Sequence, residues 1–304
     1  MAAVRGLSLT AFLERLAWAT ILWCVCEVPG WGWQSDSATV LSQLRDVGLV
    51  ATELGTDGFL PDDPQHKART LAENGLRAVG GFVPVVLHDA THDPVPEVEQ
   101  ALEGLVAAGA GTLVLAAANG SDGYDDRPLL DDASWLTMLT HLDQLDLLAS
   151  RSGITATLHP HVGTMVETMD DVERVLAGSG IGLCLDTGHL LIGGADPVAL
   201  AAAHARRIRH THLKDVDVSW ARQVQSGDVT YTEAVRRGMY RPLGQGDVDI
   251  AAIVGSLEGA GYGGWYVLEQ DTILSGPPVV GEPGPMTDVW ASIEHLRAIA
   301  KSLP

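Results

Sequence analysis

Single polar residues recur at the ends of apolar runs in this sequence, and their spacing limits the folds that the chain can adopt. His159 ends the run ITATLH, Asp186 ends IGLCLD, His212 follows IRHT, and Glu269 ends GWYVLE. From His159 to Asp186 is 27 residues and from Asp186 to His212 is 26, about the length of one strand, one helix and two loops in a β/α repeat. The pattern therefore predicts that these residues lie at the same edge of successive parallel strands.

The rest of the chain repeats the alternation of strand and helix. Glycine stands at six junctions between a predicted helix and the next strand: Gly48, Gly75, Gly109, Gly153, Gly180 and Gly261. A chain of 304 residues with 46% hydrophobic content can bury one large core. We therefore expect a single α/β domain, a (β/α)8 TIM barrel, over residues 18–304, with residues 1–17 as an N-terminal extension or short helix.

Two regions of this expected barrel are less regular. The first strand is predicted within Trp18–Val28, an apolar run that ends in the loop sequence PGWGW. From His212 to Glu269 is 57 residues, about thirty more than one repeat requires. We assign this surplus to a long loop at about residues 217–243, which is either a lid over the site or a decoration without function.

The ligand chemistry of the four polar residues suits a divalent ion. A single His or Asp at a strand end is more often a satisfied polar residue or a helix cap. Two imidazoles and two carboxylates at equivalent places in the repeat instead favour one shared ion of intermediate hardness, such as Mn, Co, Fe or Zn. His159, Asp186, His212 and Glu269 are the predicted ligands.

Further polar residues fall where the predicted strands end and their loops begin. Residues two apart in a strand share a face, so His161 is expected beside His159 and Lys214 beside His212. Lys214 is either a cation that holds a substrate oxygen or the partner of a carboxylate such as Asp215, which points the other way. His189 is either a helix cap or a substrate contact. The residues predicted to bind substrate are Glu53, His88, His189 and Lys214.

Charge and composition exclude several classes of partner. The formal net charge is −20, from 19 basic and 39 acidic residues, which argues against nucleic acid and anionic membranes because both need concentrated Lys and Arg. No uninterrupted apolar run approaches the roughly 18 residues of a membrane helix. The cysteines number three and lie in apolar runs, so we expect no disulfides and a cytoplasmic protein.

At this point the motifs HPHVGT, LDTGHL, HTHLKD and EQD, in this order and spacing, resemble the xylose isomerase-like barrels of the sugar phosphate isomerase/epimerase superfamily. The resemblance runs from Thr52 to Asp271 and is strongest to the inosose (2-keto-myo-inositol) dehydratase branch. It implies a divalent ion, Mn or Co ahead of Mg, Fe or Zn, held by the four predicted ligands. It also implies a keto-sugar or inositol derivative as substrate and a possible homo-oligomer.

One departure from that superfamily bears on the reaction. The ketose epimerases and isomerases carry a Glu where this chain has His159, and they use two Glu residues as proton carriers on opposite faces of the substrate. Here only Glu269 remains. We therefore expect a β-elimination of water from a keto-polyol, with Glu269 as the base and with His161 or Lys214 as the acid or hydroxyl anchor.

Three other functions remain open at this stage. The chain could be a keto-sugar epimerase or isomerase that uses His161 as its second base, or a lyase acting on a 3-keto-glycoside by the same α-proton chemistry. A sugar-binding protein without catalytic activity is the third. A DNA-repair endonuclease on the same fold would need more metal ligands and a basic groove, which the net charge of −20 argues against.

Overall fold

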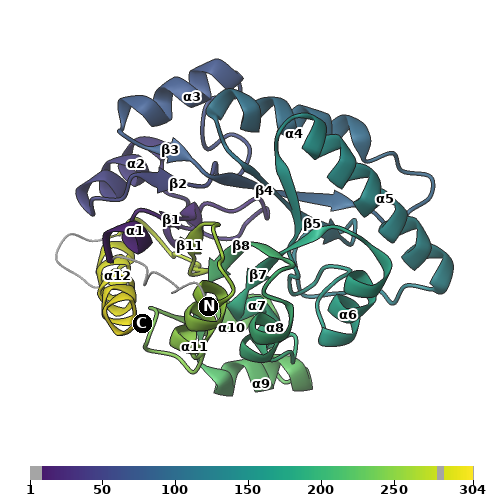
Figure 1. Cartoon of the computed structure of the whole chain (residues 1–304). Coiled ribbons are helices and arrows are strands. Elements are labelled where there is room, and N and C mark those ends of the chain that lie inside the picture. Colours follow the sequence, from purple (N-terminus) through teal and green to yellow (C-terminus); the bar gives the residue numbers. More distant parts are fainter. Residues whose placement is uncertain (1–8, 279–283, 304) are drawn as a thin grey trace, which may run out of the picture.

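The sheet of the computed structural model, which describes residues 9–278 and 284–303, consists of parallel strands that close into a barrel (Figure 1). In the order of their pairing the strands are β3 (Arg77–Ala78), β2 (Ala51–Thr52), β1 (Leu16–Trp18), β11 (Tyr266–Leu268), β8 (Ile208–Leu213), β7 (Gly182–Asp186), β6 (Thr155–Leu158), β5 (Thr112–Ala118) and β4 (Gly80–Val86). The two ends of this order, β3 and β4, are separated only by Val79 and so form one continuous stave. The described residues therefore make the expected eight-stave TIM barrel.

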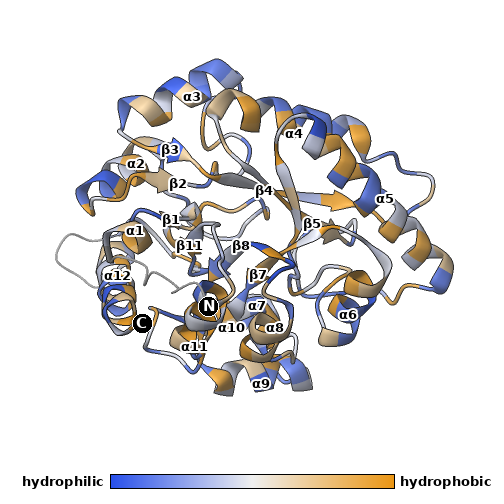
Figure 2. Cartoon of the chain, in the orientation of Figure 1, coloured by the Kyte–Doolittle hydropathy of each residue, from blue (hydrophilic) through white to orange (hydrophobic). Residues whose placement is uncertain are grey.

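Helices surround the barrel between successive strands (Figure 1). They are α2 (Ser37–Asp46), α3 (Pro64–Glu73), α4 (Val95–Ala108), α5 (Asp132–Arg151), α6 (Met169–Gly178), α7 (Thr187–Ile192), α8 (Pro197–His204), α11 (Ile250–Gly259) and α12 (Pro285–Ser302). Apolar and polar residues alternate along them (Figure 2). In α5 the buried side chains include Trp135, Met138, Leu142 and Leu145, which recur at helical spacing and cover the outer face of the sheet.

Several of these helices begin with a side chain that caps their first turn. Asp36 accepts from Thr39 N at the start of α2, and Asp196 accepts from Val198 N and Ala199 N at the start of α8. Thr168 and Asp171 form a capping box at the start of α6. Each cap satisfies backbone N–H groups that the first helical turn cannot pair.

The interior of the barrel holds a small apolar cluster below the polar residues. It consists of Ala17, Ala19, Ala51, Val79 and Val267. Val267 and Glu269 are two residues apart, so they share a face of β11 and its extension. Glu269 is thus directed to the interior at the carboxyl end of the barrel, where the loops after the strands converge.

The first strand differs from the expectation of Trp18–Val28. β1 spans Leu16–Trp18, so it begins two residues before the predicted start of the barrel at residue 18. A 3-10 helix, Thr20–Trp23, follows it, and Leu22 and Trp23 are buried there. A short apolar run has the same composition in a buried strand and in a buried turn of helix, so its periodicity could not separate the two. Before β1, helix α1 (Leu9–Leu13) lies beside α12 (Figure 1); residues 1–8 of the predicted extension lie outside the described residues.

The region 217–243, predicted as a long loop, contains regular structure. It holds α9 (Val218–Ser226), α10 (Tyr231–Arg236) and β10 (Tyr240–Arg241), and β10 pairs antiparallel with β9 (Asp215–Val216). Asp217 and Thr230 cap the two helices. Asp215 is buried and accepts hydrogen bonds from the backbone N–H groups of Gly244, Gly246 and Val248, so its carboxylate connects β9 to the segment before α11.

A membrane-spanning helix is not found within residues 9–278 and 284–303, because none of the helices there combines the required length with sufficient apolarity.

Candidate metal centre and active site

The four predicted metal ligands come together at the carboxyl end of the barrel. His159 Nε2 lies 3.1 Å from Asp186 Oδ2, and His212 Nδ1 lies 3.7 Å from the same oxygen and 3.0 Å from Glu269 Oε2. One ligand atom from each of the four residues lies within 4.8 Å of the others. The arrangement is compact enough for a single ion.

The barrel itself sets this geometry. Asp186 pairs with His212 across β7 and β8, and His212 pairs with Val267 across β8 and β11. The backbone N–H groups of His159 and Glu269 donate to the carbonyls of Leu115 and Leu213 in the neighbouring strands. Four adjacent strands of the barrel therefore fix the backbone positions of the four residues.

Asp186 has a double role that follows from its position between a strand and a helix. Its Oδ1 accepts from His189 N at 2.7 Å and caps α7. Its Oδ2 faces His159, His212 and Lys214. One carboxylate oxygen thus orients the side chain while the other belongs to the cluster.

Two buried atoms of the cluster indicate that it fits a cation. His212 Nδ1 and Glu269 Oε2 are buried and 3.0 Å apart, and neither has a hydrogen-bond partner of good geometry, although Lys214 Nζ forms an ion pair with Oε2 at 3.1 Å. Buried polar atoms are normally paired, and a divalent ion would satisfy both. The mixed nitrogen and oxygen donors suit Zn, Mn, Co or Fe.

Lys214 is a buried cation in contact with three carboxylates. Its Nζ lies 2.8 Å from Asp271, 3.1 Å from Glu269 and 3.4 Å from Asp186. Burial alone would lower the pKa of Lys214, but these carboxylates outweigh it and raise the pKa well above its ordinary value. The side chain is therefore an ammonium that pairs with the cluster and not with Asp215.

His161 and His189 are neutral imidazoles stacked on each other, with ring centroids 3.6 Å apart. Burial lowers the pKa of both well below the ordinary value. His159 and Lys214 lower the pKa of His161 further, and His161, Lys214 and His159 do the same for His189. His161 Nδ1 lies 2.7 Å from the carbonyl of Val162, so it carries the proton and Nε2 is an acceptor. His189 Nε2 accepts from Lys214 Nζ at 2.9 Å.

The other two residues predicted to bind substrate differ in their relation to the cavity, because Glu53 is among its described lining residues and His88 is not. Glu53 is only 3% exposed and contacts the imidazoles of His210 and His212. His88 is not among the described residues that line the cavity.

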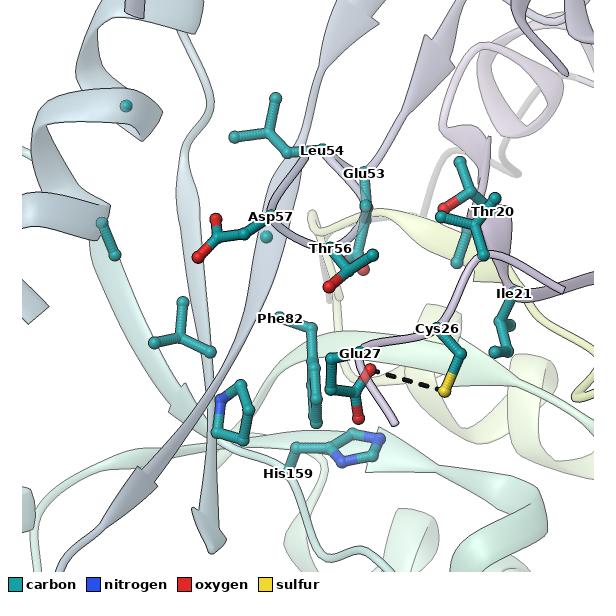
Figure 3. A pocket seen from close by; sticks show the side chains of 18 of the residues that line it. Thr20, Ile21, Cys26, Glu27, Glu53, Leu54, Thr56, Asp57, Phe82 and His159 are labelled. Atoms are coloured by element: carbon teal, nitrogen blue, oxygen red, sulfur yellow. Dashed lines mark hydrogen bonds between the residues drawn. The ribbon is translucent and has the colours of Figure 1, made fainter. Parts of the chain in front are cut away.

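A cavity of about 870 Å³ opens above the cluster. The loops after β1 and β2 form one of its sides, with Cys26, Glu27, Thr56 and Asp57 (Figure 3). Phe82 stands beside His159, with ring centroids 5.7 Å apart (Figure 3). The cavity is large enough for a cyclic polyol together with ordered water.

Three further residues of the site were not among those predicted. Asp271 binds Lys214 and accepts from the Tyr231 hydroxyl, and Tyr124 packs on His161 with ring centroids 4.2 Å apart. The motif EQD could have indicated Asp271, because it lies two residues after Glu269 on the same face. Tyr231 lies in the region 217–243, where no comparable motif indicates that it belongs to the site.

The chain matches a known protein family and several of its members. Residues 41–299 match the model of the family described as xylose isomerase-like TIM barrel. The rhizopine catabolism protein MocC of Rhizobium meliloti is 32% identical over 268 residues, which cover 84% of this chain and 81% of that protein. An inosose dehydratase of Geobacillus kaustophilus (strain HTA426) is 30% identical over 278 residues, 86% of this chain and 90% of that protein.

Solved structures with the same fold are more distant in sequence. The IOLI protein with a bound zinc atom superposes with a TM-score of 0.69 at 14% identity, covering 95% of this chain and 98% of that one. An L-ribulose 3-epimerase gives a TM-score of 0.68 at 16% identity, covering 95% of both chains. At these identities the likeness concerns the barrel fold.

Proposed function

Because the chain belongs to the xylose isomerase-like TIM barrel family, we propose that it is a metal-dependent dehydratase that removes water from a keto-polyol such as an inosose. The observation that carries the proposal is the cluster at the barrel mouth, in which His159 and Glu269 flank Asp186 and His212. The inosose dehydratases similar to this chain support the same reaction class.

The reaction is a β-elimination. A proton leaves the carbon next to the ketone, a hydroxyl leaves the adjacent carbon as water, and the new double bond is conjugated with the carbonyl. A bound divalent ion, held by His159, Asp186, His212 and Glu269, would supply Lewis-acid polarisation of the substrate oxygens. The chain's own side chains must then move two protons.

Glu269 is the proposed base. Burial raises the pKa of its carboxyl, but His212 and Lys214 outweigh that effect and the pKa is lowered below its ordinary value. The group is therefore an ionised carboxylate at neutral pH and can accept the α-proton. Its place in the cavity wall puts it against the substrate.

Lys214 is the proposed donor to the departing hydroxyl. It lies in the cavity wall beside Glu269, with Nζ and Oε2 3.1 Å apart. Lys214 gives a proton to the hydroxyl as it leaves, and the proton that Glu269 has accepted passes to Lys214 across this contact. The cycle restores both groups and releases one water.

The charges of the cavity favour an uncharged substrate. Lys67 and Lys214 are its basic lining residues, whereas carboxylates line it at Glu27, Glu53, Asp57, Asp62, Glu97, Glu103, Glu269 and Asp271. A phosphorylated or carboxylated sugar would meet this excess of negative charge. A neutral keto-polyol would not, and its hydroxyls can donate to the carboxylates.

An epimerase that works on a keto-sugar is the second candidate, and one observation favours it. His161 is a neutral imidazole whose Nε2 is an acceptor, so it could take a proton from the face opposite to Glu269. An elimination from a 3-keto-glycoside remains a variant of the first reaction with a different leaving group.

Turnover in deuterated water separates these functions. The purified chain is analysed for bound divalent metal and then incubated with inososes, keto-sugars and 3-keto-glycosides. The proposal expects a product with conjugated ultraviolet absorption. Deuterium in an epimer without that absorption would assign the epimerase reaction instead. A chain that neither contains nor is stabilised by Mn or Co would contradict both metal-dependent enzymes.

A further inference from the structure

We propose that Glu53 is a positioning residue that fixes the tautomer of His212 and thereby presents the His212 Nδ1 lone pair to the ion. The inference rests on the metal centre of the proposed function. It gives Glu53 a role in place of the substrate contact predicted from its position after the second strand.

A single oxygen of Glu53 serves two imidazoles. Oε1 lies 2.8 Å from His210 Nε2 and 3.2 Å from His212 Nε2. His210 and His212 are two residues apart on β8, so both rings point into the barrel on the same face. The carboxylate is 3% exposed and both histidines are almost completely buried, so water competes little for these hydrogen bonds.

The backbone around Glu53 is built to hold the carboxylate there. Glu53 N donates to the carbonyl of Trp18, which ties the end of β2 to β1. On the other side, a Cβ at Gly80 would lie 3.3 Å from Glu53 Oε1 and 3.1 Å from the carbonyl of Thr112. The lack of a side chain at Gly80 leaves the space that the carboxylate oxygen uses.

An ionised carboxylate can only accept hydrogen bonds, so both Nε2 atoms must carry protons. The form of His212 that binds a metal is the neutral imidazole, which has one N–H, and beside Glu53 that proton would be on Nε2. Its Nδ1, which faces Asp186 and Glu269 and makes no hydrogen bond of good geometry, then has a free lone pair. This is the form in which an imidazole binds a metal.

The charge of Glu53 should also strengthen the ligand. A carboxylate that accepts the second N–H of a metal-bound histidine orients the ring and raises its basicity, and loss of such a partner typically weakens metal binding about 10- to 100-fold. Glutamine at position 53 would keep the size but remove the charge. It would also offer NH₂ donors that can face an imidazole nitrogen.

The same three residues could instead hold an ion of their own, because Glu53, His210 and His212 also offer ligand atoms within 4.8 Å of one another. The two arrangements use opposite nitrogens of His212. In the proposed one, the metal is on Nδ1 and a proton on Nε2; in the other, the metal is on Nε2.

The decisive measurement is an NMR spectrum of the zinc-loaded chain, labelled with ¹⁵N in its histidine rings, in which ring nitrogens are correlated with ring C–H protons. The expected result is a zinc-shifted Nδ1 and a protonated Nε2 for His212, and a protonated Nε2 for His210. Zinc on Nε2 of His212, or a proton on its Nδ1, would overturn the proposal. Absence of zinc binding would instead overturn the proposed metal centre.

The affinity of the ion gives a second, independent readout. We expect Glu53→Gln to weaken Mn²⁺ binding by about 10- to 100-fold, with a circular dichroism spectrum like that of the parent chain. Glu99→Gln is the matched control, since Glu99 is exposed on α4 and does not line the cavity. A Glu53→Gln variant that folds, binds Mn²⁺ as tightly as the control and keeps the parent His212 tautomer would show that Glu53 has only a structural role.

Discussion

The Tyr231 hydroxyl donates a hydrogen bond of 2.6 Å to Asp271 Oδ2, forty residues later in the chain. The other oxygen of Asp271 lies 2.8 Å from Lys214 Nζ. Tyr240, also from the region 217–243, places its ring 5.3 Å from the same ammonium. This region therefore forms part of the wall around the proposed proton donor.

Tyr231→Phe should lower kcat/KM by roughly tenfold, because it removes a hydrogen bond to a charged group, worth about 1.5–3 kcal/mol, and leaves Asp271 free to shift with Lys214. Steady-state kinetics on the substrate found in the screen would measure the change. Tyr266→Phe is the matched control, since the Tyr266 hydroxyl also donates to a carboxylate, Glu258, but does not line the cavity. An equal loss in both variants would indicate a general effect on stability.

Lys214→Met should destabilise the metal-free chain by about 3–5 kcal/mol, because it leaves Asp186, Glu269 and Asp271 without their buried cation. A divalent ion would restore part of the lost positive charge. The increase in melting temperature on addition of Mn²⁺ should therefore be larger for this variant than for the parent chain. Equal increases measured by thermal unfolding would mean that the ion does not share these carboxylates with Lys214.

Glu269→Gln should lower kcat by about 10²- to 10⁴-fold, the usual contribution of a general base. Glutamine keeps an oxygen that can face the ion, so the variant should still bind metal. Exchange of the substrate α-proton in deuterated water, followed by NMR, would show whether proton removal itself has slowed. A variant with full exchange and full turnover would remove Glu269 from the role of base.

The sequence was sufficient to predict the barrel and the cluster, because the signal for each ligand lies in one short segment of the chain. Each predicted ligand ends an apolar run that pairs with its neighbours in a parallel sheet, so the order of residues along the chain gives their order around the barrel mouth. His159, Asp186 and His212 follow this rule directly. The spacing of the strands along the chain is therefore enough to predict where these ligands lie.

The remaining parts depend on contacts between distant segments. Tyr231 reaches Asp271 only because α10 folds back over the barrel, and no periodicity in the region 217–243 encodes that path. Glu53 ends a strand as the ligands do, but its side chain is taken up by His210 and His212. Position at the carboxyl edge of the sheet thus predicts proximity to the site but not which partner a side chain contacts.

The loop that carries His161 gives a prediction about pH. Asp171 Oδ2 accepts from the backbone N–H groups of Glu167 and Thr168 and pairs with Arg127. Burial raises the pKa of Asp171, but the hydrogen bonds from Arg127 and Thr168 outweigh it, so the pKa lies below the ordinary 3.8. A carboxyl with a lowered pKa in the folded state stabilises the fold above its unfolded pKa, and this contribution disappears as the pH falls through the folded value.

Asp171→Asn should therefore lower the free energy of unfolding by roughly 1–2 kcal/mol at pH 7. The difference from the parent chain should shrink once the pH falls below 3.8, where the parent carboxyl also becomes protonated. Urea unfolding of both chains at several pH values would measure it. Asp170→Asn is the control, since Asp170 lies in the same first turn of α6 but is exposed. A difference that stays constant down to the lowest accessible pH would show that the charge of Asp171 does not hold this loop.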